Sequence, residues 1–166
     1  MSRNVIAVIV AVLMTAMVAS LQALFPFRLA TPEVAFAWVL YLAFTSRGEL
    51  PSQVATALII GYLSDLQSGA PVGIHALSFA VLSMIARAAA TRLLSARAWQ
   101  IAIIVFLASL GHAAVLRAAE MASSVSQMLT MALTTAIAAP IVFAIGRRMD
   151  RALDPAKPRS LGFSFQ

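Results

Sequence analysis

The sequence contains no cysteine and very few charged residues. Cysteine is absent from all 166 positions, which excludes disulfides, thiol nucleophiles and zinc sites built on thiolates. Only 11% of the residues are charged and 61% are hydrophobic, which leaves too few polar side chains to cover a water-soluble fold. The chain is therefore expected to be a membrane protein, and its composition indicates no redox compartment.

The charge that is present is mostly positive, with 12 lysines and arginines against 6 acidic residues. These basic residues are scattered between apolar segments and form no run interleaved with aromatic side chains, so nucleic acid is not an expected partner. Membrane topology accounts better for their distribution, because basic residues gather in the cytoplasmic loops of membrane proteins.

Sequence motifs for catalysis and for metal binding are also missing. Serine, histidine and aspartate are present, but no GxSxG nucleophile turn accompanies them. The candidate metal ligands are His75, His112, Asp65 and Glu120, and no two of them have the short spacing of a recognised site. We therefore expect no enzyme activity, no metal site and no cofactor.

Six apolar segments follow one another, separated by glycine, proline and charged residues. We expect them at about 4–25, 34–45, 51–66, 72–94, 98–116 and 121–146. A helix needs about 20 residues to cross about 30 Å of hydrocarbon, so six crossings use most of the chain. The prediction is an all-α bundle of six transmembrane helices forming one domain, residues 1–150, and a basic cytoplasmic tail, residues 151–166.

Two of these segments differ from a regular crossing. Segment 34–45 has only 12 residues between Glu33 and Arg47, and we expect a short or tilted helix that is extended by its flanks. Pro140 lies inside the last segment, where neighbouring helices or water can satisfy the carbonyl that it leaves free. The prediction therefore keeps that segment as a single helix.

The basic residues decide the expected orientation. An even number of crossings puts both termini on one side, and cytoplasmic loops carry an excess of lysine and arginine. A cytoplasmic N-terminus places nine basic residues inside, namely Arg3, Arg47, Arg92, Arg97, Arg147, Arg148, Arg151, Lys157 and Arg159, against Arg28 and Arg117 outside. Both termini are thus expected in the cytoplasm, and the connection between the third and fourth segments is expected on the outer side.

The stretch GYLSDLQSGAPVGIHALSF brings an aspartate and a histidine to that outer connection. Gly61 and Asp65 share one helix face, where glycine admits a neighbouring backbone and a buried aspartate must face protein or water. Asp65 and His75 are candidates for the walls of an outward-open pocket. Structural roles are favoured over a pocket. Asp65 is expected to cap the glycine-rich loop with its carboxylate, and His75 and His112 are expected to form interhelical hydrogen bonds.

The order of features from Pro32 to Ala86 resembles the MreD family of bacterial rod-shape-determining membrane proteins. The resemblance rests on TPEV before a short helix, SRGEL as an inner turn, the GYLSDLQSGAPVGIHALSF stretch, and PIVFAIGRRMDRAL near the end. The glycine and aspartate pattern of the family maps onto Gly61, Asp65, Gly69 and Gly73. Any role for His75 rests on its position alone.

This resemblance implies a non-enzymatic scaffold that crosses the bacterial inner membrane several times. The implied partners are MreC and other membrane proteins of the elongation complex that inserts peptidoglycan along the rod, within the lipid bilayer, and a homodimer is left open. The implied fold is similar to the S-components of energy-coupling-factor vitamin transporters, with six helices around an outward-facing cavity.

Two other functions stay open at this point. A substrate-binding subunit of the S-component type would use the same topology, with Asp65 and His75 facing a vitamin-like ligand. The scarcity of aromatic and polar residues around the outer loops favours a scaffold over such a binder. A membrane enzyme acting on lipid-linked substrates would have to use Asp65, His75, Arg117 and Glu120.

Overall fold

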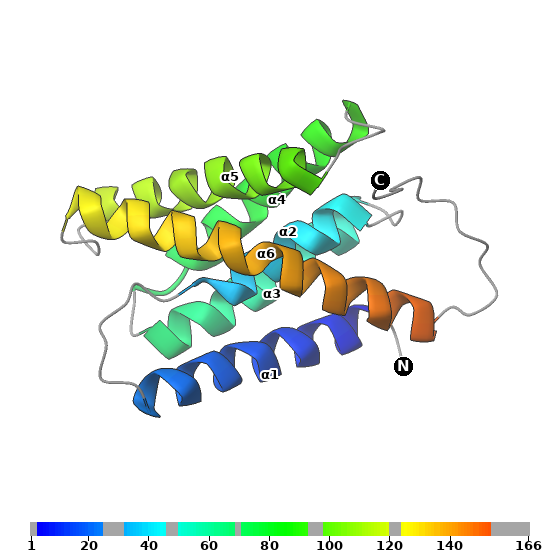
Figure 1. Cartoon of the computed structure of the whole chain (residues 1–166). Helices are drawn as coiled ribbons and strands as arrows, with labels where there is room; N and C mark the ends of the chain where they lie inside the picture. Colours follow the sequence, from blue (N-terminus) through cyan, green and yellow to red (C-terminus); the bar gives the residue numbers. More distant parts are fainter. Residues whose placement is uncertain are drawn as a thin grey trace.

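The computed structural model of the chain describes residues 3–24, 32–45, 50–68, 71–92, 98–119 and 124–153, and each regular element in these ranges is an α-helix. The helices are α1 (Arg3–Leu24), α2 (Val34–Thr45), α3 (Leu50–Ser68), α4 (Ile74–Arg92), α5 (Ala98–Ala118) and α6 (Val125–Leu153). They lie along one another as a bundle (Figure 1). The predicted all-α class is confirmed, with one helix at each of the six expected segments.

The helix bounds agree with the prediction for α2 and differ most for α6. The last helix continues to Leu153 instead of ending near Gly146, so the first three residues of the expected tail are helical. RRMDRAL contains no helix breaker, and the next proline is Pro155. Pro140 lies inside α6 and does not interrupt it, as predicted. The remainder of the tail lies outside the described residues.

The lengths and compositions of the helices bear on a membrane location. Among the described residues, Gln100–Ala118 and Val125–Leu153 are long and apolar enough to cross a bilayer. Shorter apolar helical stretches cover Asn4–Ser20, Val34–Thr45 and Ile74–Ala90. The fold thus fits a membrane protein, while the number of crossings and their direction stay predictions.

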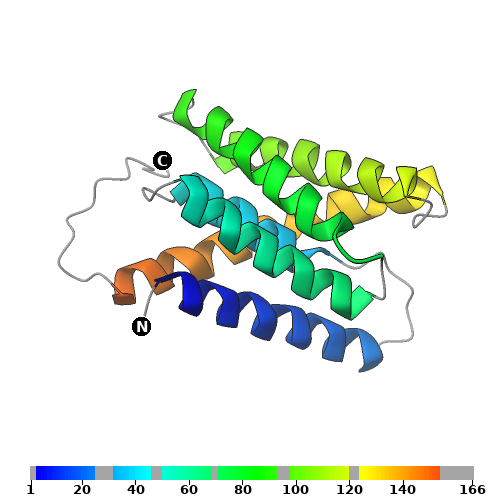
Figure 2. The ribbon, with the colours of Figure 1, turned by 180° about the vertical axis from the view of Figure 1, so that it is seen from behind.

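Helix α2 occupies the centre of the bundle. All nine residues from Ala35 to Ala43 are buried, as expected for a helix that is apolar on every side. The other five helices all contact α2, which lies behind α6 in Figure 1 and behind α3 in the reverse view of Figure 2. Pro32 and Glu33 are not helical, so the expected extension of α2 is absent at its N-terminal side.

Two polar side chains of α2 tie it to the first and last helices. Trp38 donates a 3.0 Å hydrogen bond from Nε1 to the carbonyl oxygen of Ala7, and the hydroxyl of Tyr41 donates one of 2.6 Å to Asp150. The ring of Tyr41 lies directly over Gly146, where a Cβ atom would collide with it. The start of α1 and the end of α6 lie at the same end of the bundle (Figure 1).

Candidate functional site

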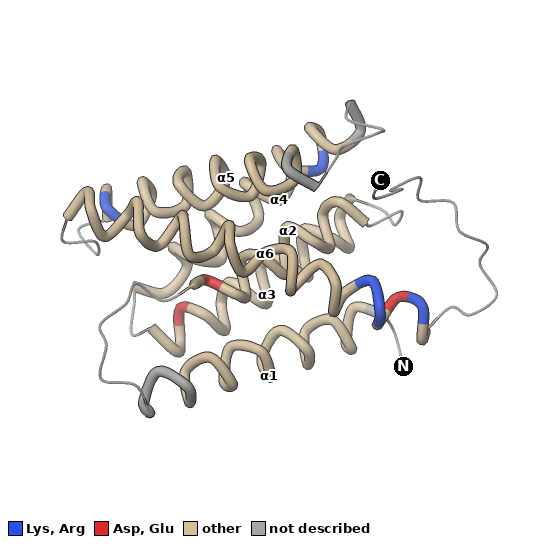
Figure 3. The backbone as a smooth tube through the Cα atoms, in the orientation of Figure 1, with Lys and Arg blue, Asp and Glu red and all other residues tan. Residues whose placement is uncertain are grey.

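Five polar side chains converge next to the N-terminus of α2 and are here called the Glu33 cluster. The cluster consists of Glu33, Asp65 of α3, His75 and Ser78 of α4, and His112 of α5. Its two acidic positions, beside α2 and on α3, lie far from the basic C-terminal end of α6 (Figure 3). The antiparallel course of the chain therefore gathers polar groups from four elements at one level of an apolar bundle.

Glu33 reaches the interior because α2 is short. The chain enters the bundle as non-helical backbone, which is tolerated at depth only where protein surrounds it. The amide of Glu33 donates a 3.0 Å hydrogen bond to Oγ1 of Thr135 on α6, and its carbonyl oxygen accepts one of 3.0 Å from Ala37. Anchored in this way, the side chain is only 18% exposed and points at both histidines.

The carboxylate of Asp65 caps the N-terminus of α4. Its Oδ2 accepts hydrogen bonds from the amides of Gly73 at 2.8 Å and Ala76 at 3.3 Å, while Oδ1 accepts one of 2.9 Å from the amide of His75. Gly73 adopts a φ of 107°, a conformation that side chains with a Cβ atom rarely adopt. A carboxylate at a helix N-terminus is stabilised by unpaired amides and by the helix dipole.

The two histidine rings are held by different partners on their Nδ1 atoms. Nδ1 of His75 lies 2.9 Å from Oδ1 of Asp65, and Nδ1 of His112 lies 2.8 Å from the hydroxyl oxygen of Ser78. The ring centroids are 5.2 Å apart, and Phe36 stacks on His112 at 5.0 Å. Both Nε2 atoms therefore face Glu33, His112 at 2.8 Å from Oε2 and His75 at 3.5 Å from Oε1.

Burial and charge act in opposite directions on Glu33, which precedes the first turn of α2. Burial alone raises the pKa of its carboxyl group, but the facing His112 and His75 outweigh this and lower that pKa to about 2. Glu33 is therefore an anion at neutral pH, stabilised by the two rings that face it.

Gly61 sets the distance between α3 and α4. A Cβ atom at this position would lie 2.5 Å from Cα of Ala76 and 2.7 Å from the carbonyl oxygen of His75. These are backbone atoms, which cannot turn aside as the end of a side chain can. The close approach lets Asp65, one turn further along α3, reach the amides at the start of α4.

The structure brings together some of the residues singled out in the sequence. Asp65 and His75 are in contact, and Gly61 and Gly73 frame that contact. Gly69 and Glu120 lie outside the described residues.

Glu33 was not among the site residues expected from the sequence. In the sequence it stands out only as a polar flank of the short second segment. A usable signal was nevertheless present, because an antiparallel six-helix bundle puts two of its connections, the one before α2 and the one before α4, at the same end. Glu33 belongs to the first connection, and His75 follows the second.

Comparison with known proteins assigns the chain to a family. No curated protein and no solved structure matches the chain. A sequence model of the family described as rod shape-determining protein MreD matches residues 1–149. This match covers all six helices apart from the last residues of α6. The chain therefore belongs to the MreD family, as its resemblance in sequence predicted.

Proposed function

We propose that the chain is a non-enzymatic membrane subunit of the rod complex that binds MreC and supports peptidoglycan synthesis along the cell. Membership of the MreD family implies a role in determining rod shape. A bundle of apolar helices with a polar cluster closed within it suits a scaffold, because its surface is left for lipid and for partner helices.

The observation that carries this proposal is the burial of Asp65 and of both histidines in the Glu33 cluster. The exposed fraction is 1% for Asp65, 5% for His75 and 0% for His112. A catalytic acid, base or nucleophile has to come within hydrogen-bond reach of its substrate. In the described part of the chain these groups instead contact one another and the start of α4, which favours a structural role over an enzymatic one.

The outer surface of α6 supports a membrane location. Large apolar side chains are exposed along it at every fourth position, namely Val125, Leu129, Leu133, Ile137, Ile141 and Ile145. Such a continuous apolar surface is unusual on a soluble monomer and suits contact with lipid. We place the chain in the bacterial inner membrane with six crossings and both termini in the cytoplasm, because this orientation keeps most basic residues inside.

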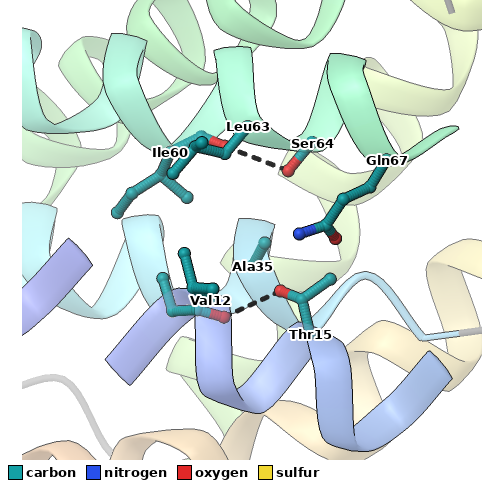
Figure 4. Close-up of a pocket in the computed structure, with 8 residues that line it drawn as sticks. Val12, Thr15, Ala35, Ile60, Leu63, Ser64 and Gln67 are labelled. Atoms are coloured by element: carbon teal, nitrogen blue, oxygen red, sulfur yellow. Dashed lines mark hydrogen bonds between the residues drawn. The ribbon is translucent and has the colours of Figure 1, made fainter. Parts of the chain in front are cut away.

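A hollow between α1, α2 and α3 bears on the alternative function, a vitamin-binding subunit. Its cavity volume is about 10 Å³, roughly the room that one water molecule needs and far below the roughly 300–1,000 Å³ typical of small-molecule pockets. The hydroxyls of Thr15 and Ser64 at its wall turn back to carbonyl oxygens of their own helices, at 2.8 and 3.1 Å (Figure 4). This small hollow offers little to a vitamin-sized ligand, so the scaffold is favoured.

Gene deletion and membrane pull-down test the proposal together. Deletion is expected to convert rods into round cells, and the wild-type chain should restore the rods and recover MreC from solubilised membranes. Rod-shaped deletion cells with MreC absent from the pull-down would contradict the scaffold function. Co-purification of a small molecule that is lost with Asp65→Ala would favour the transporter subunit instead.

A further inference from the structure

We propose that the Glu33 cluster binds a divalent transition metal ion, Zn²⁺ in the first place, through the carboxylate of Glu33 and Nε2 of His75 and His112. One ligand atom from each of the three residues lies within 4.8 Å of the other two. Two imidazoles and one carboxylate form a donor set typical of zinc. This proposal reverses the expectation from sequence spacing that the chain has no metal site.

The contacts of Ser78 are compatible with the His112 tautomer that a metal ligand needs. The hydroxyl of Ser78 lies 3.1 Å from the carbonyl oxygen of His75, to which it can donate its single proton. Its oxygen then accepts from Nδ1 of His112, 2.8 Å away. In a neutral ring this tautomer leaves the lone pair on Nε2, which faces the carboxylate of Glu33.

Nε2 of His112 lies 2.8 Å from Oε2 of Glu33 and, among the described residues, has no partner that meets the geometry of a hydrogen bond. Ligands of one metal ion adopt this arrangement, since each of them points at the ion and not at its neighbour.

The outer contacts of both rings match those of metal-binding histidines. Such residues usually direct their other ring nitrogen to a carboxylate, a carbonyl or a water, which fixes the ring orientation. Asp65 holds Nδ1 of His75 at 2.9 Å and Ser78 holds Nδ1 of His112 at 2.8 Å. Both Nε2 atoms are consequently turned toward the same carboxylate before any ion arrives.

The donor set and the local charge favour zinc over other ions. Magnesium and calcium prefer oxygen ligands, whereas imidazole nitrogen suits zinc and its neighbours in the first transition row. The carboxylates of Glu33 and Asp65 balance the two charges of Zn²⁺ in a buried place where net charge is costly. Three protein ligands leave one position for water.

A metal ion here would join elements that are distant in the sequence. Its ligands would come from the entry to α2, from α4 and from α5, while Asp65 adds α3 and the Thr135 contact to Glu33 adds α6. The ion would thus fix one end of the bundle. This inference does not depend on binding to MreC and can be tested on the isolated chain.

The test uses the full chain in detergent micelles, purified with a histidine-free affinity tag. After chelator treatment, the wild-type chain is expected to take up one Zn²⁺ with submicromolar affinity, measured by competition with a chromophoric chelator. Its thermal midpoint should rise when zinc is restored. Co²⁺ should give the intense visible bands of a four-coordinate site, and X-ray absorption should detect two imidazoles per ion.

Matched variants make the test specific to these residues. Glu33→Gln removes the charged ligand and should weaken binding by at least about 100-fold, and Ser78→Ala should weaken it by about 10-fold. Asp150→Asn alters an acidic residue of α6 outside the cluster and should leave zinc affinity unchanged.

The chain has only two histidines, so ligation by two imidazoles identifies this site without any variant. Folded wild-type chain that gains neither zinc nor thermal stability would overturn the proposal. Oxygen-only ligation, or equal binding by Glu33→Gln, would overturn it as well by showing an adventitious ion.

Discussion

Oε2 of Glu33 lies 2.8 Å from Nε2 of His112, and the second oxygen of the same carboxylate faces Nε2 of His75 at 3.5 Å. One glutamate outside any helix thus connects the fourth and fifth helices of the bundle. Removing any of these three groups changes the charge balance of a buried site, which makes their contacts open to measurement by substitution.

Loss of the Glu33 carboxylate is expected to destabilise the bundle strongly. Glu33→Ala leaves Nε2 of two buried histidines without the carboxylate that faces them, and each buried polar group left unsatisfied costs about 1–3 kcal/mol in free energy of unfolding. Glu33→Gln should cost less, because its amide still forms a hydrogen bond to one ring. Unfolding by denaturant in micelles measures both.

Thr130→Ala is the control for the Glu33 variants. It removes an exposed hydroxyl of α6 that bonds back to its own helix, so its free energy of unfolding should be close to that of the wild type. A stability of Glu33→Ala equal to that of the control would show that the contacts of Glu33 with the two histidines contribute nothing.

Asp65→Asn should weaken the junction of α3 and α4 despite its nearly identical shape. The asparagine NH₂ group would face amides that also donate, and hydrogen bonds to a charged acceptor contribute about 1.5–3 kcal/mol. We expect a lower thermal midpoint and faster hydrogen exchange at the start of α4. Ser64→Ala on the same helix should change neither quantity, and unchanged exchange in Asp65→Asn would refute the capping role.

Two glycine substitutions should have opposite effects. Alanine is favoured over glycine within helices by about 1 kcal/mol, so Gly111→Ala, whose Cβ atom would meet only a side-chain methyl of Leu82 at 3.5 Å, should be neutral or stabilising. Gly61→Ala should be destabilising by about 1–3 kcal/mol, because its Cβ atom overlaps the backbone of α4. Thermal unfolding of the two variants compares them directly. Equal midpoints would mean that α3 and α4 separate without cost.

The predicted orientation can be tested with reporter fusions. A fluorescent protein at the C-terminus should fluoresce and alkaline phosphatase there should be inactive, because that end is expected in the cytoplasm. Phosphatase fused after Ala119, beyond α5, should be active, since an odd number of crossings precedes it. Active phosphatase at the C-terminus would reverse the topology and move the Glu33 cluster to the cytoplasmic half.

The sequence alone determined the class of the protein and the order of its helices. Low charge and six apolar segments require helices, since backbone groups in an apolar surrounding must be satisfied internally. It also placed Asp65 and His75 near one connection, because they are close in the chain. The end of α6 was predicted too early, because proline and glycine mark helix ends more clearly than basic residues do.

Only the tertiary structure decided what these residues contact. Successive helices run in opposite directions, which indicates which residues lie at the same end of the bundle. The rotation of each helix about its axis depends instead on side-chain packing with all of its neighbours. That packing turns His75 and His112 inward and stops α2 short, so that Glu33 lies between them. The spacing of Glu33, His75 and His112 in the sequence does not predict that their side chains meet, since they come from three different elements.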